Sequence, residues 1–144
     1  MPNRRVSEVI GQRTFPIVAP DTTVRDAAII MKEWDSSAVL VMEDGALVGI
    51  CTERDIVVRA IAAGCIPAMT CVTTIMTSDV QIIHRDKPFG YALHLMYEGG
   101  FRHIPVVDDT GHPLGLLAAH DALDLDGLQM EQELVRREEI TIIL

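Results

Sequence analysis

The sequence lacks a long apolar run, an excess of basic residues and a cysteine framework. No stretch approaches the roughly 20 apolar residues that span a membrane, and the N-terminal MPNRRVSEVIGQR has no apolar core of a secretory signal. Cys51, Cys65 and Cys71 show no C-x-x-C spacing, so neither a disulfide framework nor a zinc ribbon is predicted. The net charge of −9 repels a phosphate backbone. We therefore expect a cytoplasmic protein that binds neither membranes nor nucleic acid polymers, and no metal.

The composition is that of a folded globular protein. Apolar residues make up 49% of the 144 residues, and no low-complexity tract or block of like charges is present. A chain of this size can bury about 68–70% of the surface that it exposes when unfolded. The length fits one domain or two small halves.

An internal repeat organises the chain. Residues 65 positions apart match in type along much of the sequence. Matching pairs are Ile17 and Ile82, Asp21 and Asp86, Ala27 and Ala92, Met31 and Met96, Glu33 and Glu98, Val41 and Val106, and Asp44 and Asp109. A short lead-in precedes each copy, VSEVIG at 6–11 and VTTIMT at 72–77. We place the first repeat at 1–65 and the second at 70–127, joined around Gly64–Thr70.

Each repeat predicts the same order of elements. Thr23 and Asp26 have the spacing of a capping box that opens a helix, and Asp44-Gly45 predicts a hairpin turn between two strands. The predicted elements of the first repeat are a strand at Phe15–Ala19, a helix from Val24, strands at Ala38–Met42 and Leu47–Cys51, and a helix from Glu53 to Ala63. Those of the second are a strand at Val80–His84, a helix at Pro88–Glu98, strands at His103–Val107 and Leu114–Ala118, and a helix from His120.

The fold class that follows is α/β (α+β), with two tandem β-α-β-β-α units. Such a unit covers only one face of its small sheet, so we expect the two units to pack face to face with pseudo-two-fold symmetry. The segment 128–144 lies outside the repeat and predicts an amphipathic helix followed by an apolar, strand-like end. An apolar end in water favours aggregation, so we expect it either to contact another subunit or to fold back on its own chain.

The segment Gly49–Asp55 (GICTERD) lies where a strand turns into a helix, a position suited to phosphate. Gly49 would let a ligand approach the backbone, Thr52 offers a hydroxyl, and the Asp55 carboxylate can accept hydrogen bonds from both hydroxyls of a ribose. Thr52 and Asp55 also have the spacing of a helix cap and its partner, which needs no ligand. Spacing alone leaves both interpretations open.

Residues 6–127 resemble a pair of cystathionine-β-synthase-type (CBS) domains, the tandem unit also called a Bateman module. The repeat carries the resemblance, together with VTTIMT, RHIPVVDDTG at 102–111 and GICTERD at 49–55. The resemblance implies a site for AMP, ADP, ATP or S-adenosylmethionine, with Asp55 on the ribose and Thr52 near the phosphate. It also implies that the adenine lies against apolar residues such as Ile17, Val18 and Val39, which a core strand would equally need.

The second copy of the motif keeps Gly115 and Asp121 but has Ala118 where a hydroxyl is expected. Losing a hydrogen bond to a charged group weakens binding by about 1.5–3 kcal/mol, so we expect an impaired second site in which His120 partly replaces the missing contact. In CBS pairs, basic residues at positions such as Arg102 and His103 reach toward phosphate. Both residues also have ordinary explanations, as a solvated arginine and a partly buried neutral histidine.

No sequence motif for catalysis is present, so we expect a non-catalytic sensor without a catalytic cofactor, whose regulatory ligand is an adenine nucleotide. Energy sensing or signalling is the expected setting, with a homodimer of two CBS pairs forming a flat disc and an unidentified protein target. A first alternative is a CBS-fold interaction subunit that binds no ligand. A second is a redox sensor acting through Cys51, which requires an accessible thiol of lowered pKa.

Overall fold

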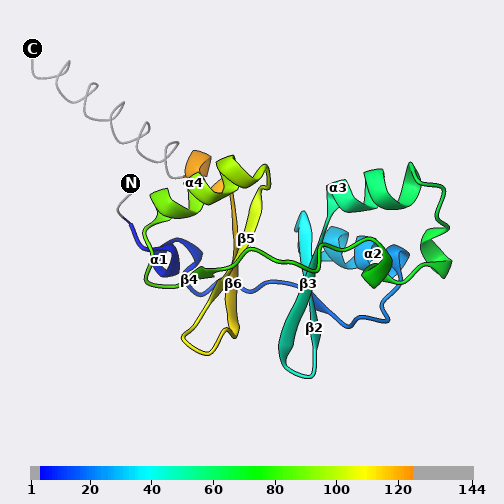
Figure 1. The fold of residues 1–144 in the computed structure, drawn as a ribbon, viewed down its shortest axis with the longest axis horizontal. Coiled ribbons are helices and arrows are strands. Elements are labelled where there is room, and N and C mark those ends of the chain that lie inside the picture. Colours follow the sequence, from blue (N-terminus) through cyan, green and yellow to red (C-terminus); the bar gives the residue numbers. More distant parts are fainter. Residues whose placement is uncertain (1–3, 125–144) are drawn as a thin grey trace, which may run out of the picture.

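The computed structural model describes residues 4–124 and contains two similar units (Figure 1). Each unit has a three-stranded sheet, in the order β1-β2-β3 or β4-β5-β6. In both sheets the first strand pairs parallel with the second, and the second pairs antiparallel with the third. The predicted fold class is therefore confirmed, and the repeat in the sequence is a repeat in the structure.

The elements follow one another in the predicted order. Those of the first repeat are β1 (Ile17–Val18), α2 (Val24–Trp34), β2 (Ala38–Glu43), β3 (Ala46–Thr52), α3 (Glu53–Asp55) and the π-helix η1 (Ile56–Ile61). Those of the second are β4 (Ile83–His84), α4 (Phe89–Gly99), β5 (His103–Val107) and β6 (Pro113–Ala118). Before and between them lie α1 (Val6–Ile10) and the 3-10 helices η2 (Pro67–Met69) and η3 (Val72–Thr74). The predicted tail at 128–144 lies outside the described residues.

Local signals in the sequence explain several of these boundaries. The Asp26 N–H donates to Thr23 Oγ1 (3.1 Å), which caps α2 as predicted. Asp44 and Gly45 have φ angles of 50° and 78°, the left-handed values that a tight hairpin requires. Pro88 is the N-cap of α4 rather than a residue of its first turn. No helix within 4–124 is both long and apolar enough to cross a bilayer.

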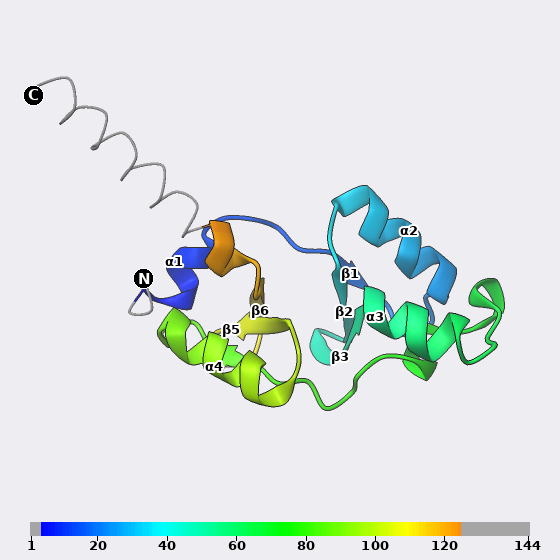
Figure 2. The same ribbon diagram turned by 90° about the horizontal axis from the view of Figure 1, so that it is seen from above.

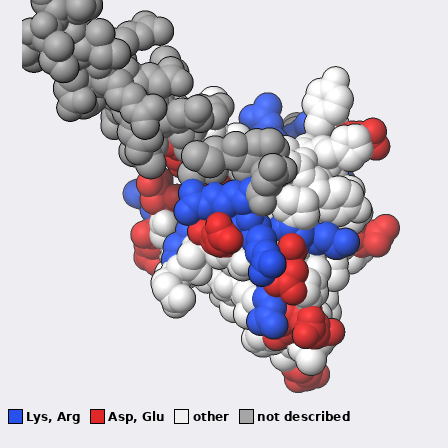
Figure 3. Space-filling view, turned by 90° about the vertical axis from the view of Figure 1, so that its left-hand side faces the viewer, with Lys and Arg blue, Asp and Glu red and all other residues white. Residues whose placement is uncertain are grey.

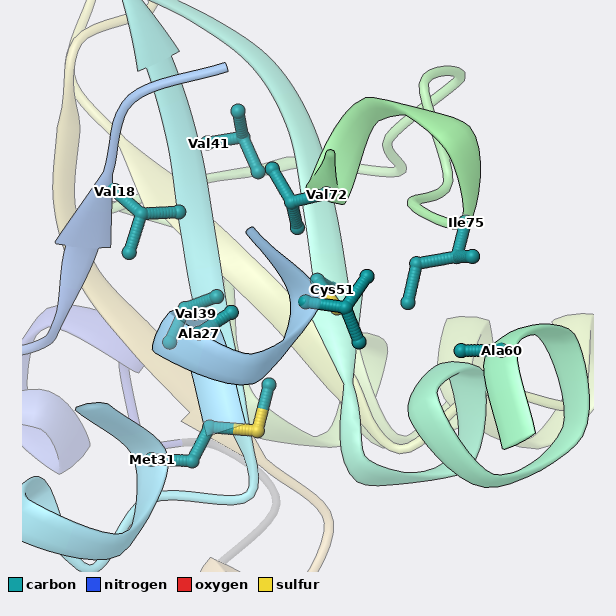
Figure 4. Packing of buried hydrophobic residues seen from close by; sticks show 10 residues of the cluster. Val18, Ala27, Met31, Val39, Val41, Cys51, Ala60, Val72 and Ile75 are labelled. Atoms are coloured by element: carbon teal, nitrogen blue, oxygen red, sulfur yellow. The ribbon is translucent and has the colours of Figure 1, made fainter. Parts of the chain in front are cut away.

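A separate apolar core fills the space between sheet and helices in each repeat. In the first repeat, Ala27 and Met31 of α2 pack with Val39, Val41 and Cys51 of the sheet (Figure 4). Alternate residues of a strand point to opposite faces, so Val39 and Val41 face the helices while Leu40 between them faces away. The second core is built in the same way, around Phe89, Ala92, Met96, Ile104, Val106 and Leu117.

The opposite faces of the two sheets pack against each other. Leu40 and Ile50, from the face of the first sheet that carries no helix, form a third apolar cluster with Leu116 and Val80 of the second repeat. This cluster joins the units and confirms the face-to-face packing. Clefts lined by residues of both repeats remain beside this contact.

The lead-in segments are exchanged between the units. Val6 and Ile10 of α1 belong to the core of the second repeat, whereas Val72 and Ile75 belong to the core of the first. The chain therefore crosses between the units twice, after α1 and again after η3, on opposite sides of the molecule (Figure 2). These crossings bring residues of one repeat to the ligand motif of the other.

Candidate functional site

Thr52 and Asp55 form a reciprocal helix cap. The Asp55 N–H donates to Thr52 Oγ1 (3.2 Å), and the Thr52 N–H donates to Asp55 Oδ2 (2.9 Å). Asp55 has a relative exposure of 9%, and its other oxygen lies 3.7 Å from Arg59 Nε. The capping interpretation is thus confirmed, whereas a ligand role for these residues stays a prediction.

The glycines of both motifs make room for the exchanged lead-ins. A Cβ at Gly49 would lie 2.3 Å from Met76 Sδ, and one at Gly115 would lie 2.5 Å from Ile10 Cδ1. Gly49 therefore contacts protein at the position where the sequence suggested close approach of a ligand. The sequence offered no sign of this contact, because nothing in it indicates which lead-in packs against which repeat.

The second motif contains an ion pair that the sequence did not predict. Asp121 has a relative exposure of 4%, and its Oδ2 accepts a hydrogen bond from the Ala118 N–H (2.8 Å). The Arg13 guanidinium donates to both carboxylate oxygens, over 2.9 Å to Oδ1 and 2.7 Å to Oδ2, and also to the Leu116 carbonyl (3.0 Å). Burial works to raise the pKa of the Asp121 carboxyl, but the hydrogen bonds from Arg13 and the Ala118 N–H, together with the charges of Arg13 and His120, outweigh it and keep that pKa below its usual value.

A cleft of about 910 Å³ opens beside Asp121 between the two repeats. Its volume is within the range of small-molecule sites. Both repeats and the first crossing segment contribute polar side chains to the lining, which are Arg13, Thr14, Lys32, Asp35, Ser36, Ser37, Glu53, His103, His120 and Asp121. Thr52 and Asp55 are absent from the lining of this cleft.

His103 and Ser37 connect the repeats inside the cleft. Ser37 Oγ lies 2.5 Å from His103 Nε2, a hydrogen bond between the residue before β2 and the first residue of β5. Burial, assisted by the nearby charge of His120, lowers the pKa of His103 to about 4, so its ring is neutral at pH 7. Arg102, its neighbour, is exposed and does not line the cleft.

The apolar residues expected beside an adenine lie elsewhere. Val18 and Val39 are buried in the helix-facing core of the first repeat, and Ile17 is half exposed; none of the three lines the cleft. For Val18 and Val39 the structure therefore shows the core role that the sequence also allowed. Phe15, Pro16, Met31 and Leu116 supply apolar surface to the cleft instead.

The redox hypothesis for Cys51 is wrong. Its thiol is fully buried in the core of the first repeat. Burial, and to a lesser extent the charge of Asp55, raises its pKa to about 12. A redox-active cysteine needs the opposite on both counts, an accessible position and a lowered pKa.

His120, Asp121 and Asp124 offer ligand atoms that lie within 4.8 Å of one another. Asp121 already has its carboxylate oxygens bound to Arg13 and to the Ala118 N–H. These contacts occupy three of the roughly four acceptor positions of that carboxylate, and His120 and Asp124 are exposed, so the cluster alone does not support a metal centre.

Comparison with known proteins identifies the repeated unit. The CBS domain model matches residues 6–61 and again 72–127. The chain belongs to the CBS-domain family. CBS domains are generally regulatory modules. An uncharacterized 17.7 kDa protein of Acidianus ambivalens is 33% identical over 118 residues, which is 81% of this chain and 70% of that protein.

Larger CBS proteins match over a small part of their length. The Arabidopsis thaliana CBS domain-containing protein CBSCBSPB1 is 40% identical over 94 residues, which is 65% of this chain but 17% of that protein. This chain thus spans about a fifth or less of the first plant and fission-yeast relatives that it matches.

Solved CBS structures have the same architecture. A conserved protein from Pyrococcus horikoshii superposes with a TM-score of 0.80 at 27% identity, covering 88% of this chain and 94% of that one. The CBS domain pair of protein MJ0100, in complex with 5′-methylthioadenosine and S-adenosylmethionine, gives 0.78 at 25% identity, over 89% and 99%. The AMP complex of PAE2072 from Pyrobaculum aerophilum gives 0.75 over 81% and 88%, and at 22% identity it shows the fold alone.

Proposed function

We propose that this CBS pair is a non-catalytic regulatory module that binds an adenosine-containing ligand in the cleft between its repeats. The observation that carries the proposal is the convergence of polar side chains from both repeats, among them Ser37, His103 and Asp121, on one cleft of about 910 Å³. The CBS pair of protein MJ0100, in complex with S-adenosylmethionine and 5′-methylthioadenosine, supports the ligand class.

Asp121 is the candidate for holding the ribose, since a carboxylate can accept hydrogen bonds from both hydroxyls of a sugar. The hydroxyl missing at Ala118 has a substitute on the other repeat, because Ser37 lies in the same cleft. His103, neutral at pH 7, can donate or accept a hydrogen bond there. The cleft thus favours the second motif, which the sequence alone predicts to be the impaired one.

The first motif remains a second candidate position. Gly49, Thr52 and Asp55 match the family pattern more fully than the second motif does. Asp55 differs from Asp121 in its partners, since its Oδ1 has only the longer contact with Arg59. A ribose bound there would have to leave the cap between Asp55 Oδ2 and the Thr52 N–H intact.

Calorimetry with AMP, ATP and S-adenosylmethionine tests the proposal, using Asp121→Asn and Asp55→Asn as matched variants. Asparagine keeps an oxygen for the backbone N–H that each aspartate accepts, so neither helix start is dismantled. We expect Asp121→Asn to weaken the tightest ligand at least tenfold and Asp55→Asn to change it less than threefold. The reverse result would place the site at the first motif, and binding of none of the three ligands would refute the function.

A CBS-fold interaction subunit without a ligand is the second candidate function. Val58 and Ile61 of η1 are apolar yet have relative exposures of 51% and 56%. Val57 of the same helix is also exposed, at 59%, and contiguous exposed apolar patches can mark contact surfaces. We propose that this surface joins two copies of the chain. Calorimetry distinguishes the two candidate functions, since an interaction subunit would give flat titrations with all three ligands.

A further inference from the structure

The carboxylate proposed to hold the ribose already has a cation bound to it. Arg13 belongs to the segment that crosses from α1 to β1, and it reaches Asp121 from 108 positions away in the sequence. The pair is bidentate, the geometry in which arginine binds carboxylates most strongly. Asp121 is buried, whereas the Arg13 side chain is 42% exposed, so the arginine is the partner that is free to move.

Arg13 and a ribose compete for the hydrogen-bond acceptor positions of the Asp121 carboxylate. Asp121 Oδ2 accepts from Arg13 and from the Ala118 N–H, while Oδ1 accepts from Arg13. A carboxylate has about four acceptor positions. One remains, on Oδ1, and a ribose diol needs two. A ribose can therefore bind with both hydroxyls only after the guanidinium has left at least one oxygen.

Releasing Arg13 leaves a guanidinium inside a cleft with mixed charge. Lys32 is the other cation of the lining, which also contains Asp35 and Glu53. The cleft has no general positive field that would attract any anion. Arg13 can swing only as far as its side chain reaches, so it stays close to any ligand held by Asp121.

We propose that Arg13 makes this cleft selective for adenosine ligands with a 5′ phosphate over uncharged nucleosides. A phosphate offers the displaced guanidinium a new bidentate anion, so the ligand replaces the contact that its ribose breaks. A neutral nucleoside breaks the same contact but offers the displaced guanidinium no anion to bind. Arg13 is thus a specificity-determining residue, and this role rests on the adenosine-binding function proposed above.

Calorimetry with AMP and adenosine, which differ only in the phosphate, tests this role. Arg13→Gln removes the charge and the bidentate contact, and Arg13→Lys keeps the charge without the fork geometry. Lys32→Gln is the matched control, because it removes the other cation that lines the same cleft. The ratio of the two affinities is the readout, since a general loss of folded protein affects both ligands equally.

We expect the wild type to prefer AMP at least thirtyfold and Arg13→Gln to reduce that preference at least tenfold, through both weaker AMP binding and unchanged or tighter adenosine binding. Arg13→Lys should fall between them, and Lys32→Gln should change the preference less than threefold. An unchanged preference in Arg13→Gln, or an equal loss in Lys32→Gln, would overturn the role of Arg13 while leaving the adenosine site intact. Binding of neither ligand by the wild type would refute the proposed function itself.

Discussion

His103 shows how the fold sets the protonation state of a single side chain. Its pKa in the folded protein is about 4, against an ordinary value of 6.5, because burial disfavours the charged ring and His120 and Arg102 add repulsion. Asp121 and Asp55 oppose this effect without outweighing it. The unfolded chain therefore takes up a proton at a higher pH than the folded one does, and stability is lost as the pH falls from 6.5 toward 4.

We expect the titration of His103 alone to lower the free energy of unfolding by about 2 kcal/mol when the pH falls from 7.5 to 5. Urea denaturation at the two pH values measures it, and His103→Asn should remove most of that difference. His94, exposed on α4, is the control position, and His94→Asn should leave the difference unchanged. Equal pH dependence in wild type and His103→Asn would contradict the assignment.

At this scale the sequence predicted contacts between near neighbours and missed those between distant residues. The bond between Thr52 and Asp55 spans three positions, so the spacing within one helix turn was enough to predict it. Arg13 and Asp121 lie 108 positions apart, and Ser37 and His103 lie 66 apart. Their contacts depend on which faces of the sheets meet and on how the lead-ins cross, and no local pattern encodes either.

The start of α3 gives a test at the scale of one element. Thr52→Ala removes the hydroxyl that accepts from the Asp55 N–H, and we expect a loss of about 1 kcal/mol of unfolding free energy. Thr52→Ser should retain most of that stability. Thermal or urea denaturation measures both variants, and nucleotide calorimetry on the same samples shows whether Thr52 acts as more than a cap. A loss of affinity larger than tenfold in the alanine variant alone would support a ligand site at the first motif.

The contacts of the lead-ins with the two motif glycines predict unequal costs for adding a methyl group. At Gly49 the obstacle is the thioether end of Met76, which is flexible, whereas at Gly115 it includes Cβ and Cγ1 of Ile10, which is branched and held in a core. Overpacking a core costs typically 1–3 kcal/mol. We expect Gly115→Ala to fall in that range and Gly49→Ala to cost less, as measured by urea denaturation. Ile10→Ala should relieve part of the clash with the methyl group of Gly115→Ala, so the double variant should lose less stability than the two single variants together. Fully additive losses of unfolding free energy would argue against this contact.

Among the elements, those defined by a short-range pattern were predicted best. β5 occupies the predicted His103–Val107, and α2 begins at the predicted Val24. The first strand of each repeat is shorter than predicted, since β1 pairs with β2 through only Ile17 and Val18. A helix was predicted from Glu53 to Ala63, and from Ile56 to Ile61 it is a π-helix, a form for which periodicity at 3.6 residues gives no signal.

Across the whole molecule the exchanged lead-ins make the two repeats mutually dependent. The core of each repeat contains apolar residues from the lead-in of the other, so a single repeat cut at its sequence boundaries would lose part of its own core.

The charged side chains at the surface show no comparable organisation. On the end formed by the second repeat and α1, basic and acidic side chains lie intermixed (Figure 3). Pairs such as Arg4 with Glu8 and Arg5 with Asp86 are exposed, and exposed pairs contribute about 0–1 kcal/mol each.

The apolar residues exposed on η1 predict how the whole molecule assembles. If Val58 and Ile61 meet the same surface of a second copy, the wild type is a dimer, and charge placed there leaves unpaired carboxylates in the contact. We expect Val58→Glu with Ile61→Glu to give a monomer by light scattering and sedimentation velocity. Ile82→Glu, an exposed apolar position ahead of β4, is the control and should leave the dimer intact.

Deleting residues 128–144 separates this interface from the tail that the sequence also predicted to contact another subunit. If the η1 surface alone holds the dimer, the truncated chain stays dimeric and the double glutamate variant is monomeric in either background. A monomeric truncated chain together with a dimeric glutamate variant would place the contact at the tail, and a monomeric wild type would refute both interfaces.

Titrating AMP into the monomeric variant tests whether the cleft, which lies between the repeats of one chain, binds its ligand without a second copy. We expect that it does, because the polar residues of the cleft all come from the same chain: Asp121, Arg13, Ser37 and His103.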